Sequence, residues 1–508
     1  MYDAPVSTIA SVLRDFRFGV ARMPMGRRMI PIKLVYAEWP LPIGCSAYNS
    51  LMNERHAAHG RRVALLTSGS LTKAIFTIAL PIMIANTFGV AMELANAFFL
   101  GRVGSDALAA VIMAGAIVFF IMTFGAGLGI GTVALVARAY GERNYRKGEH
   151  IGAQSMVLGI ILSVAMGAMG FLLTPELLAL MGAKGPVHDM ATTYLRIAFA
   201  GLPFMIFMFQ AGAVFQGAGD TITPTKISAF ATILNIVFDP IMIFGLLGFP
   251  ALGVTGAAIS SLTARVIGCA LMVRVIVSGK HAVRLRRSSF DLDWGVMKRI
   301  FMVGFPGAIQ MMLRSSSFLV MTGLAAMFGH VVIAAFGVGN RLFGIFLLPG
   351  FGFGAASSTI VGQNLGAKNP ARAERGVFLI VAYYMSLILA VAIPLFIFSR
   401  QVAWVFNHEE SFVALTSEVI RFVAAGAVFL PFGMIFAQAL QGAGATVTPM
   451  IVTAVTLYGV QLPLAWYLST HAGWGARGVW TANIISGLVN ALLMSWMFLR
   501  GDWKRTRV

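Results

Sequence analysis

The sequence predicts an all-α polytopic membrane protein of about twelve transmembrane helices, arranged as two parallel repeats of six helices each. Three observations predict this fold: the composition, a series of long apolar segments, and an internal repeat. Of the 508 residues, 58% are hydrophobic and only 11% are charged, whereas a soluble domain has about 25% charged residues. Most of the chain is therefore expected to face lipid or other apolar helices.

Long apolar segments follow one another along most of the chain, separated by short connectors. A helix that crosses the hydrocarbon core of a bilayer needs about 20 apolar residues, and these segments reach that length. Taken in order, they give the predicted number of transmembrane helices. The predicted spans are residues 73–99, 106–135, 151–173, 190–214, 225–247, 253–277, 299–326, 333–362, 376–398, 416–440, 447–469 and 477–499.

Charged residues in the connectors predict the orientation. The net charge is +19, and basic residues gather in the connectors on the side of the two chain ends, as cytoplasmic lysines and arginines do. We predict a multi-pass protein of the cell inner (plasma) membrane with both termini cytoplasmic, in contact with the lipid bilayer and not with nucleic acid. The basic connector residues include Arg138, Arg143, Arg146, Lys147, Arg274, Lys280, Arg284, Lys298, Lys368, Arg372 and Arg375.

The second half of the chain repeats the first at a constant offset of 225 residues, with Pro81 matching Pro306 and Gly104 matching Gly329. Each half has six spans, an even number, so both halves enter the membrane in the same orientation. Two bundles related in this way form a central cleft near the bilayer midplane, and rocking them exposes the cleft to alternate sides. The longest repeated string is Gln216-Gly217-Ala218-Gly219, which returns as Gln441-Gly442-Ala443-Gly444.

The predicted domain organisation follows this repeat. Residues 65–280 form an N-lobe of six transmembrane helices and residues 299–500 a C-lobe of six. A cytoplasmic linker over 281–298 joins them, and a cytoplasmic tail covers 501–508. Residues 1–64 are basic and contain no apolar run of span length. They are interpreted as a cytoplasmic extension that is either disordered or upstream of the true start.

Motifs for several kinds of chemistry are absent from the sequence. It contains no Gly-x-x-x-x-Gly-Lys-[Ser/Thr] phosphate loop, no His-Glu-x-x-His zinc motif and no Gly-x-Ser-x-Gly elbow. Its two cysteines lie far apart and imply neither a disulfide framework nor a zinc site. We therefore predict no enzyme activity, no catalytic residues and no cofactor, and an ion gradient as the source of energy.

The fifth predicted span contains an acidic residue, Asp239, with Asn235 one turn before it. Residues four apart lie on one face of a helix, so the pair could share a proton or a cation. Pro240 removes a backbone donor and can kink the helix there. Charged groups inside a membrane are costly and mostly functional, although a structural hydrogen bond is the alternative. The equivalent positions in the second half of the chain are Val460 and Leu464. The fold therefore does not require a polar pair at these positions.

Four further polar residues inside predicted spans are candidates for a functional role. Glu93 and Asn96 lie three apart in the first span and are candidates for ion coupling, although Glu93 could instead reach the interface. Gln310 and Arg314 lie in the seventh span and are candidates for a substrate cavity. Arg314 could pair with Glu93 or Asp239, bind an anionic group of a substrate, or form a purely structural ion pair.

Over about residues 70 to 500, the chain resembles the multidrug and toxic compound extrusion family. The resemblance rests on the order and spacing of several short motifs, none of which is decisive alone. The motifs are Pro81, the run from Phe99 to Ala110, Gly217 to Thr221, Asn235 to Pro240, Gly253 to Ala258, and Val361 to Ala367.

The resemblance implies two six-helix lobes around a V-shaped cavity and the export of lipophilic, often cationic, compounds in exchange for H+ or Na+. It places Asn235 and Asp239 on the family's N-lobe cation-binding pair, which is the one candidate position for Na+, and Ser261 near a hydroxyl of that site. Asn96 stands where the family often has an acid, and Glu93 one turn earlier is a candidate replacement. Arg314 stands where some relatives have an acidic residue, and Gln438 stands at the position of an acidic residue in the tenth helix of the family. The C-lobe thus lacks coupling carboxylates, and ion coupling is expected in the N-lobe.

Three functions are consistent with these features. The first is a secondary active multidrug exporter, expected to act as a monomer, that antiports lipophilic or cationic small molecules against H+, the favoured ion, or Na+. The second is a flippase of a lipid-linked or polysaccharide precursor, which an arginine-lined cavity would favour. The third is a non-transporting membrane receptor or scaffold, which would tolerate Asp239→Asn.

Overall fold

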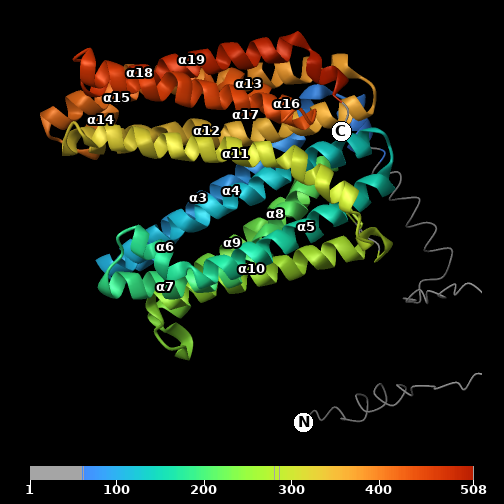
Figure 1. Ribbon diagram of the computed structural model, residues 1–508, viewed down its shortest axis with the longest axis horizontal. Coiled ribbons are helices and arrows are strands. Elements are labelled where there is room, and N and C mark those ends of the chain that lie inside the picture. The colour runs from blue at the N-terminus through green and yellow to red at the C-terminus, as the bar shows by residue number, and fades with distance from the viewer. Residues whose placement is uncertain (1–59, 61, 280, 285–286, 507–508) are drawn as a thin grey trace, which may run out of the picture. The chain divides into compact units, whose positions relative to one another are not determined.

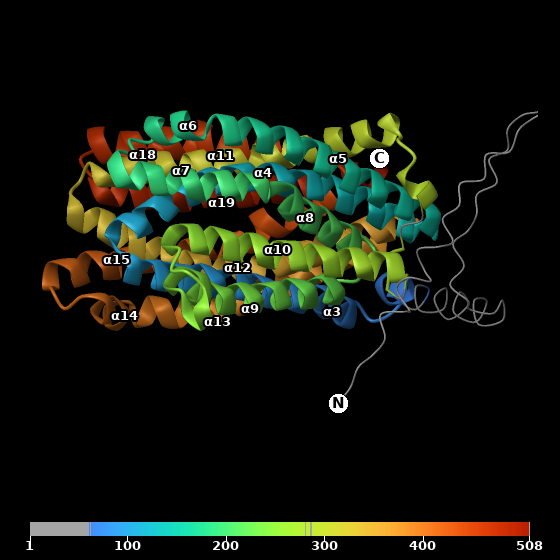
Figure 2. The ribbon, with the colours of Figure 1, turned by 90° about the horizontal axis from the view of Figure 1, so that it is seen from below.

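The computed structural model describes residues 60, 62–279, 281–284 and 287–506, and every regular element in this part of the chain is a helix. Figures 1 and 2 show the long helices running along one common direction, as helices that cross a bilayer do. The first bundle contains α3 (Leu71–Val103), α4 (Ser105–Gly141), α5 (Tyr145–Leu172), α6 (Thr174–Leu180), α7 (Gly185–Ala200), α8 (Leu202–Gly217), α9 (Ile222–Phe244), η1 (Leu246–Gly248) and α10 (Gly253–Ser278).

The second bundle follows the short η2 (Arg287–Phe290) and repeats this order. It contains α11 (Trp294–Ala326), α12 (His330–Gly366), α13 (Pro370–Ile397), α14 (Ser399–Phe406), α15 (Glu410–Ala427), η3 (Pro431–Ile435), α16 (Phe436–Gly442), α17 (Val447–Ala454), η4 (Val455–Gln461), α18 (Leu462–Trp466), η5 (Tyr467–His471) and α19 (Ala476–Arg500), before η6 (Asp502–Arg505).

The number of membrane spans confirms the prediction. Ten helical segments of the described chain are long and apolar enough to cross a membrane, and two bent pairs raise the number to twelve if each pair is one span. The bends are 48° between α7 and α8 and 45° between α15 and the helices after it. Pro203 follows the first bend and Pro431 the second, and each lacks the amide that would continue the helical hydrogen bonds.

The internal repeat is confirmed in the lengths of the helices. The first three helices of each bundle have 33, 37 and 28 residues in both lobes. The fifth span differs between the two lobes. In the N-lobe it is the continuous α-helix α9, whereas its counterpart over Val447–His471 contains two π-helical segments. The two lobes therefore share one fold but differ at the helix on which Asp239 lies.

The two bundles meet where the backbones of α4, α11 and α12 approach closely. A Cβ on Gly131 of α4 would lie 2.5 Å from the carbonyl oxygen of Ile300 on α11. A Cβ on Gly366 of α12 would collide with the carbonyl oxygen of Arg138 on α4. Small residues allow such close helix packing in membranes. In Figure 1, α3–α10 and α11–α19 lie together at this end and spread apart toward the end where α6 and α14 lie.

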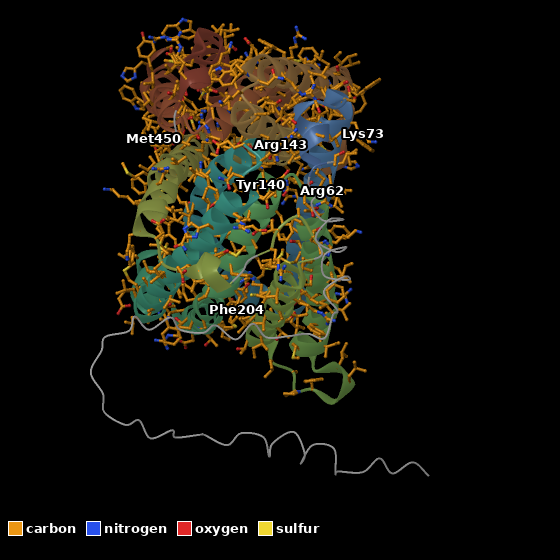
Figure 3. All side chains as sticks on the ribbon, turned by 90° about the vertical axis from the view of Figure 1, so that its right-hand side faces the viewer. Arg62, Lys73, Tyr140, Arg143, Phe204 and Met450 are labelled. Atoms are coloured by element: carbon orange, nitrogen blue, oxygen red, sulfur yellow. The ribbon has the colours of Figure 1, made fainter. Side chains whose placement is uncertain are left out.

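A helical stretch over residues 62–67 joins both lobes at the end where they meet. Arg62, labelled in Figure 3, donates to Asp220 of the N-lobe at 2.6 Å. The carbonyl oxygen of Leu66 accepts from the Nε of Arg372 of the C-lobe at 3.3 Å. Residues 62–64 of the predicted extension are therefore helical, whereas its residues 1–59 and 61 lie outside the described residues. The predicted domain bounds stay a prediction.

The predicted linker over 281–298 packs against the N-lobe in the part that the structure describes. The Nε2 of Gln154 on α5 donates to the carbonyl oxygens of Ser289 and Asp291 at 3.1 and 2.7 Å, and its Oε1 accepts from the amide of Asp293 at 3.1 Å. The hydroxyl of Tyr140 donates to the carbonyl oxygen of Ala282. Helix α11 begins at Trp294, five residues earlier than predicted, because the side chain of Asp293 accepts from the amide of Val296 and caps it.

The packing of α4 predicts an effect of helix spacing on stability. Gly131→Val would force a side chain against the backbone of α11, and such overpacking costs about 1–3 kcal/mol. We expect a lower midpoint of thermal unfolding for this variant of the purified protein in detergent. The matched control is Gly115→Val on the same helix, where a Cβ would meet no atom within 4 Å. Equal midpoints for the two variants would contradict the proposed contact.

Candidate ion and substrate site

Helices α9 and α10 bring four polar side chains together inside the N-lobe. Asn235 and Asp239 are 2% and 0% exposed, and the Nδ2 of Asn235 donates to the Oδ1 of Asp239 at 3.3 Å. The same Nδ2 lies 3.0 Å from the Oγ of Ser260 and 3.2 Å from the Oγ of Ser261. Ser260 in turn donates to the carbonyl oxygen of Asn235. The structure thus brings three of the predicted ion-coupling residues into one cluster.

Two buried oxygens of this cluster have no hydrogen-bond partner among the described residues. They are the Oδ2 of Asp239 and the Oδ1 of Asn235. Buried polar atoms are nearly always hydrogen-bonded, and an unpaired one costs about 1–3 kcal/mol. The cluster therefore has unused capacity to accept a proton or to coordinate a cation.

Asn96 of α3 lies at the same level as this cluster. Leu100, one turn beyond Asn96, packs in one apolar cluster with Ile243, one turn beyond Asp239, and with Ala257, one turn before Ser261. Helices α3 and α9 run in the same direction and lie in contact. The Oδ1 of Asn96 is also buried without a hydrogen-bond partner in the described chain. A third unpaired oxygen therefore lies in the same layer of the N-lobe.

Three residues near the cluster were not predicted. Ser260 could not be distinguished from Ser261 before the crossing of α9 and α10 was known. Tyr194 on α7 packs against the apolar cluster that contains Leu100, and Arg265 lies on α10 one turn after Ser261. A signal for Arg265 was present in the sequence, because it is a charged residue inside a predicted span.

The structure does not bring Glu93 into this cluster. Glu93 is exposed on α3, and it has no hydrogen bond or ion pair to any residue that the structure describes. Its role in ion coupling stays a prediction. Arg314 is exposed on α11 and has no ion pair with Glu93 or Asp239 in the described chain. The interpretations of Arg314 that require such a pair therefore find no support in this conformation.

Gln310 lies between helices of the C-lobe rather than at an exposed surface. It is 4% exposed, and its Nε2 donates to the Oγ1 of Thr453 at 2.8 Å and to the carbonyl oxygen of Pro449 at 3.2 Å. Its Oε1 accepts from the Nε2 of Gln441 at 2.6 Å. All polar atoms of the Gln310 side chain thus have partners within the lobe, and a role in a substrate cavity stays a prediction.

The residues available for a metal ion are few. Across residues 60, 62–279, 281–284 and 287–506, no group of three or more His, Cys, Asp or Glu side chains could hold a metal ion. The oxygens around Asp239 and Asn235 come instead from one carboxylate, amides and hydroxyls, which suit a hard cation such as Na+ or a proton.

Both lobes match known transporters. A family model described as MatE matches residues 81–241 and 306–467. The chain is 26% identical over 442 residues to the probable multidrug resistance protein NorM of Thermotoga maritima, covering 86% of this chain and 94% of that protein. It is 26% identical over 443 residues to the FAD transporter of Shewanella oneidensis, covering 86% and 95%.

A solved structure is similar in fold over the same region. It is an outward-facing conformation of a multidrug resistance MATE family transporter of the MOP superfamily. The TM-score is 0.81 at 26% sequence identity, and the match covers 87% of this chain and 99% of that chain. The similarity therefore extends over both six-helix lobes.

The unpaired oxygen of Asp239 predicts how the cluster responds to substitution. Asp239→Asn keeps the shape of the side chain and removes a buried charge, so we expect thermal stability equal to or above that of the wild type. Asn235→Ala removes the amide that faces three oxygens and should lower the free energy of unfolding by about 1–3 kcal/mol. Both are measured by thermal unfolding of the purified protein. A strongly destabilised Asp239→Asn would favour the structural alternative for this carboxylate.

Proposed function

This chain belongs to the MatE family, whose members are membrane transporters, and from that premise we propose that it is a secondary active exporter. The proposal is that it antiports lipophilic small molecules against H+ or Na+ by alternating access, with Asp239 binding the coupling ion. One observation carries it: a fully buried carboxylate whose Oδ2 has no partner among the described residues. Membrane carboxylates in such positions are mostly functional.

A proton is favoured over sodium by the orientation of Asn235. Its NH2 group faces Asp239, Ser260 and Ser261, so an amide donor occupies the place where a cation would need an oxygen. A proton on the free Oδ2 of Asp239 would require no such rearrangement. A sodium ion would require the amide of Asn235 to turn and present its Oδ1.

Ion binding can drive transport only if the two conformations bind the ion with different affinity. The cluster joins α9 to α10, and α9 also contacts α3, which packs on α12 of the opposite lobe. Pro240 follows Asp239 directly and leaves the helix without one backbone donor at this point. We propose that neutralising Asp239 changes the bend of α9, and that α3 passes this change to the contact between the lobes.

The distribution of charge supports an outward-open state. The lobes meet at the end of α4 and α12 where Arg138, Arg143 and Arg372 lie, and Figure 3 labels Arg143 at this end. Basic connectors mark the cytoplasmic side. We therefore propose that the protein lies in the inner membrane with both chain ends cytoplasmic and that the lobes are closed toward the cytoplasm. A single chain contains both lobes, which supports a monomer.

The central prediction concerns the coupling carboxylate. Asp239→Asn should lower gradient-driven export of a fluorescent lipophilic substrate by at least about tenfold, because a neutral amide cannot change its charge with the ion. Export is measured in proteoliposomes under an imposed proton gradient and then under a sodium gradient. The gradient that drives the wild type identifies the ion.

The matched control is Asp189→Asn, which removes an exposed carboxylate of α7 whose side chain is 86% exposed. This variant should export at the wild-type rate. Export by Asp239→Asn at the wild-type rate would contradict the proposed mechanism and favour a receptor or scaffold. If the folded wild type exports no substrate under either gradient, the result would instead favour a flippase.

The position of Asn96 predicts a rescue. A carboxylate at this position would lie in the same layer as Asp239, so Asn96→Asp combined with Asp239→Asn should restore part of the ion-driven export. The comparison is between the double variant and Asp239→Asn alone, under the gradient that drives the wild type. Equal rates for the two would show that Asn96 does not share the ion site.

A further inference from the structure

Two arginines of the C-lobe lie at one level of the α11–α12 hairpin. Phe318 of α11 stacks on Phe336 of α12, with ring centroids 6.3 Å apart and an interplanar angle of 21°. Arg314 lies four residues before Phe318, and Arg341 lies five residues after Phe336. Because the two helices run in opposite directions, these steps lead the same way along the hairpin, so Arg314 and Arg341 lie at about the same level along it.

Both arginines lie on helix faces that are turned toward the N-lobe. Arg314 lies seven residues, about two turns, after Gly307, where a Cβ would be 2.8 Å from Ile130 of α4. Arg341 lies eleven residues, about three turns, before Gly352, where a Cβ would be 2.7 Å from the carbonyl oxygen of Ala79 on α3. Residues at these spacings share one face of a helix.

Neither arginine has an ion-pair or hydrogen-bond partner in the part of the chain that the structure describes, and both are exposed. The other arginines of the outer half of this lobe are paired: Arg400 with Glu410, Arg477 with Glu418, and Arg421 with the Oγ of Ser399. A charge inside a membrane span is costly without a partner. The absence of a partner therefore points to a ligand that supplies one.

Apolar side chains flank the two exposed arginines. Phe318 and Ile345, one turn from Arg314 and Arg341 respectively, are large apolar side chains with exposed fractions of 53% and 49%. An accessible wall with two cations and adjacent apolar groups suits a ligand with an anionic group and an apolar part.

We propose that Arg314 and Arg341 together bind the anionic group, a phosphate or carboxylate, of an amphiphilic substrate. Two guanidinium groups can each donate two hydrogen bonds to such a group. This inference rests on the proposed function, because it names the class of substrate that the exporter carries. It differs from the expectation of cationic substrates, since two unpaired guanidinium groups would repel a positive charge beside them.

The test is equilibrium binding to the purified full chain in detergent, measured by the fluorescence of two flavins. Riboflavin 5′-phosphate and riboflavin have the same ring system and differ in the phosphate. We expect the phosphate to bind at least about tenfold more tightly, and Arg314→Gln or Arg341→Gln to remove that preference. The matched control is Arg196→Gln, which changes an exposed arginine of α7 that lies over the ring of Phe171.

A second arm distinguishes a soluble amphiphile from a lipid headgroup. Fluorescent phosphatidic acid is compared with fluorescent phosphatidylcholine under the same conditions and with the same variants. An arginine-dependent preference for riboflavin 5′-phosphate over riboflavin identifies a soluble substrate. An arginine-dependent preference that is found only for phosphatidic acid over phosphatidylcholine identifies a lipid. Either supports the proposal.

The proposal is overturned if charged and uncharged probes bind equally, or if both glutamine variants, shown to be folded by thermal unfolding, bind as the wild type does. Binding at equilibrium needs no ion gradient, and Asp239→Asn should keep the preference. A chain that binds the phosphate through these arginines but exports nothing under either gradient would refute the exporter and leave the anion site standing.

Discussion

The close approach of α4 to α11 and α12 is the contact on which the arrangement of the two lobes depends. At Gly131 and Gly366, a side chain on one helix would meet the backbone of the other, so the lobes can pack this tightly only because these residues are glycines. Without water between the helices to drive association, such van der Waals contact is a main source of stability. The contact also fixes the end of the molecule at which the bundles lie together.

The duplicated fold assigns different chemistry to its two halves. The N-lobe contains the buried carboxylate of Asp239, whereas the repeat places Leu464 at that position, on a helix with π-helical segments. The C-lobe contributes Arg314 and Arg341, which form the proposed anion site. In the proposed account, the N-lobe binds the coupling ion and the C-lobe binds the charged part of the substrate. The proposed coupling between the lobes runs through α3, because this helix contacts both α9 and α12.

Much of the fold could be predicted from the sequence, because lipid imposes a long apolar run on each helix and a duplicated gene leaves a constant offset. The cluster of Asn235, Asp239 and Ser261 was also predictable in outline, since a four-residue spacing fixes the common face of α9 and the family resemblance supplied Ser261. The bends after α7 and α15 were not predicted, although Pro203 and Pro431 were visible signals.

Contacts between helices could not be predicted from spacing alone. The hydrogen bonds that Gln310 donates to Thr453 and accepts from Gln441 depend on how α11 crosses α16 and α17. The pairing of Ser260 with Asn235 depends in the same way on the crossing of α10 and α9. The level shared by Arg314 and Arg341 became visible only through the stacking of Phe318 on Phe336. A charged residue inside a span, such as Arg314, can be recognised in the sequence. What its side chain faces depends on how the helices pack.

In the proposed mechanism the ionisation of Asp239 controls the separation of the two lobes, and this separation can be measured as a distance. Ser105 and His330 are exposed, repeat-equivalent positions at the start of α4 and α12. Spin labels on Ser105→Cys and His330→Cys, in a chain whose native cysteines are replaced, report this separation by pulsed electron resonance. We expect a distance distribution that shifts with pH in the wild type and does not shift in Asp239→Asn. The same pH-dependent shift in both proteins would show that Asp239 does not control the separation of the lobes.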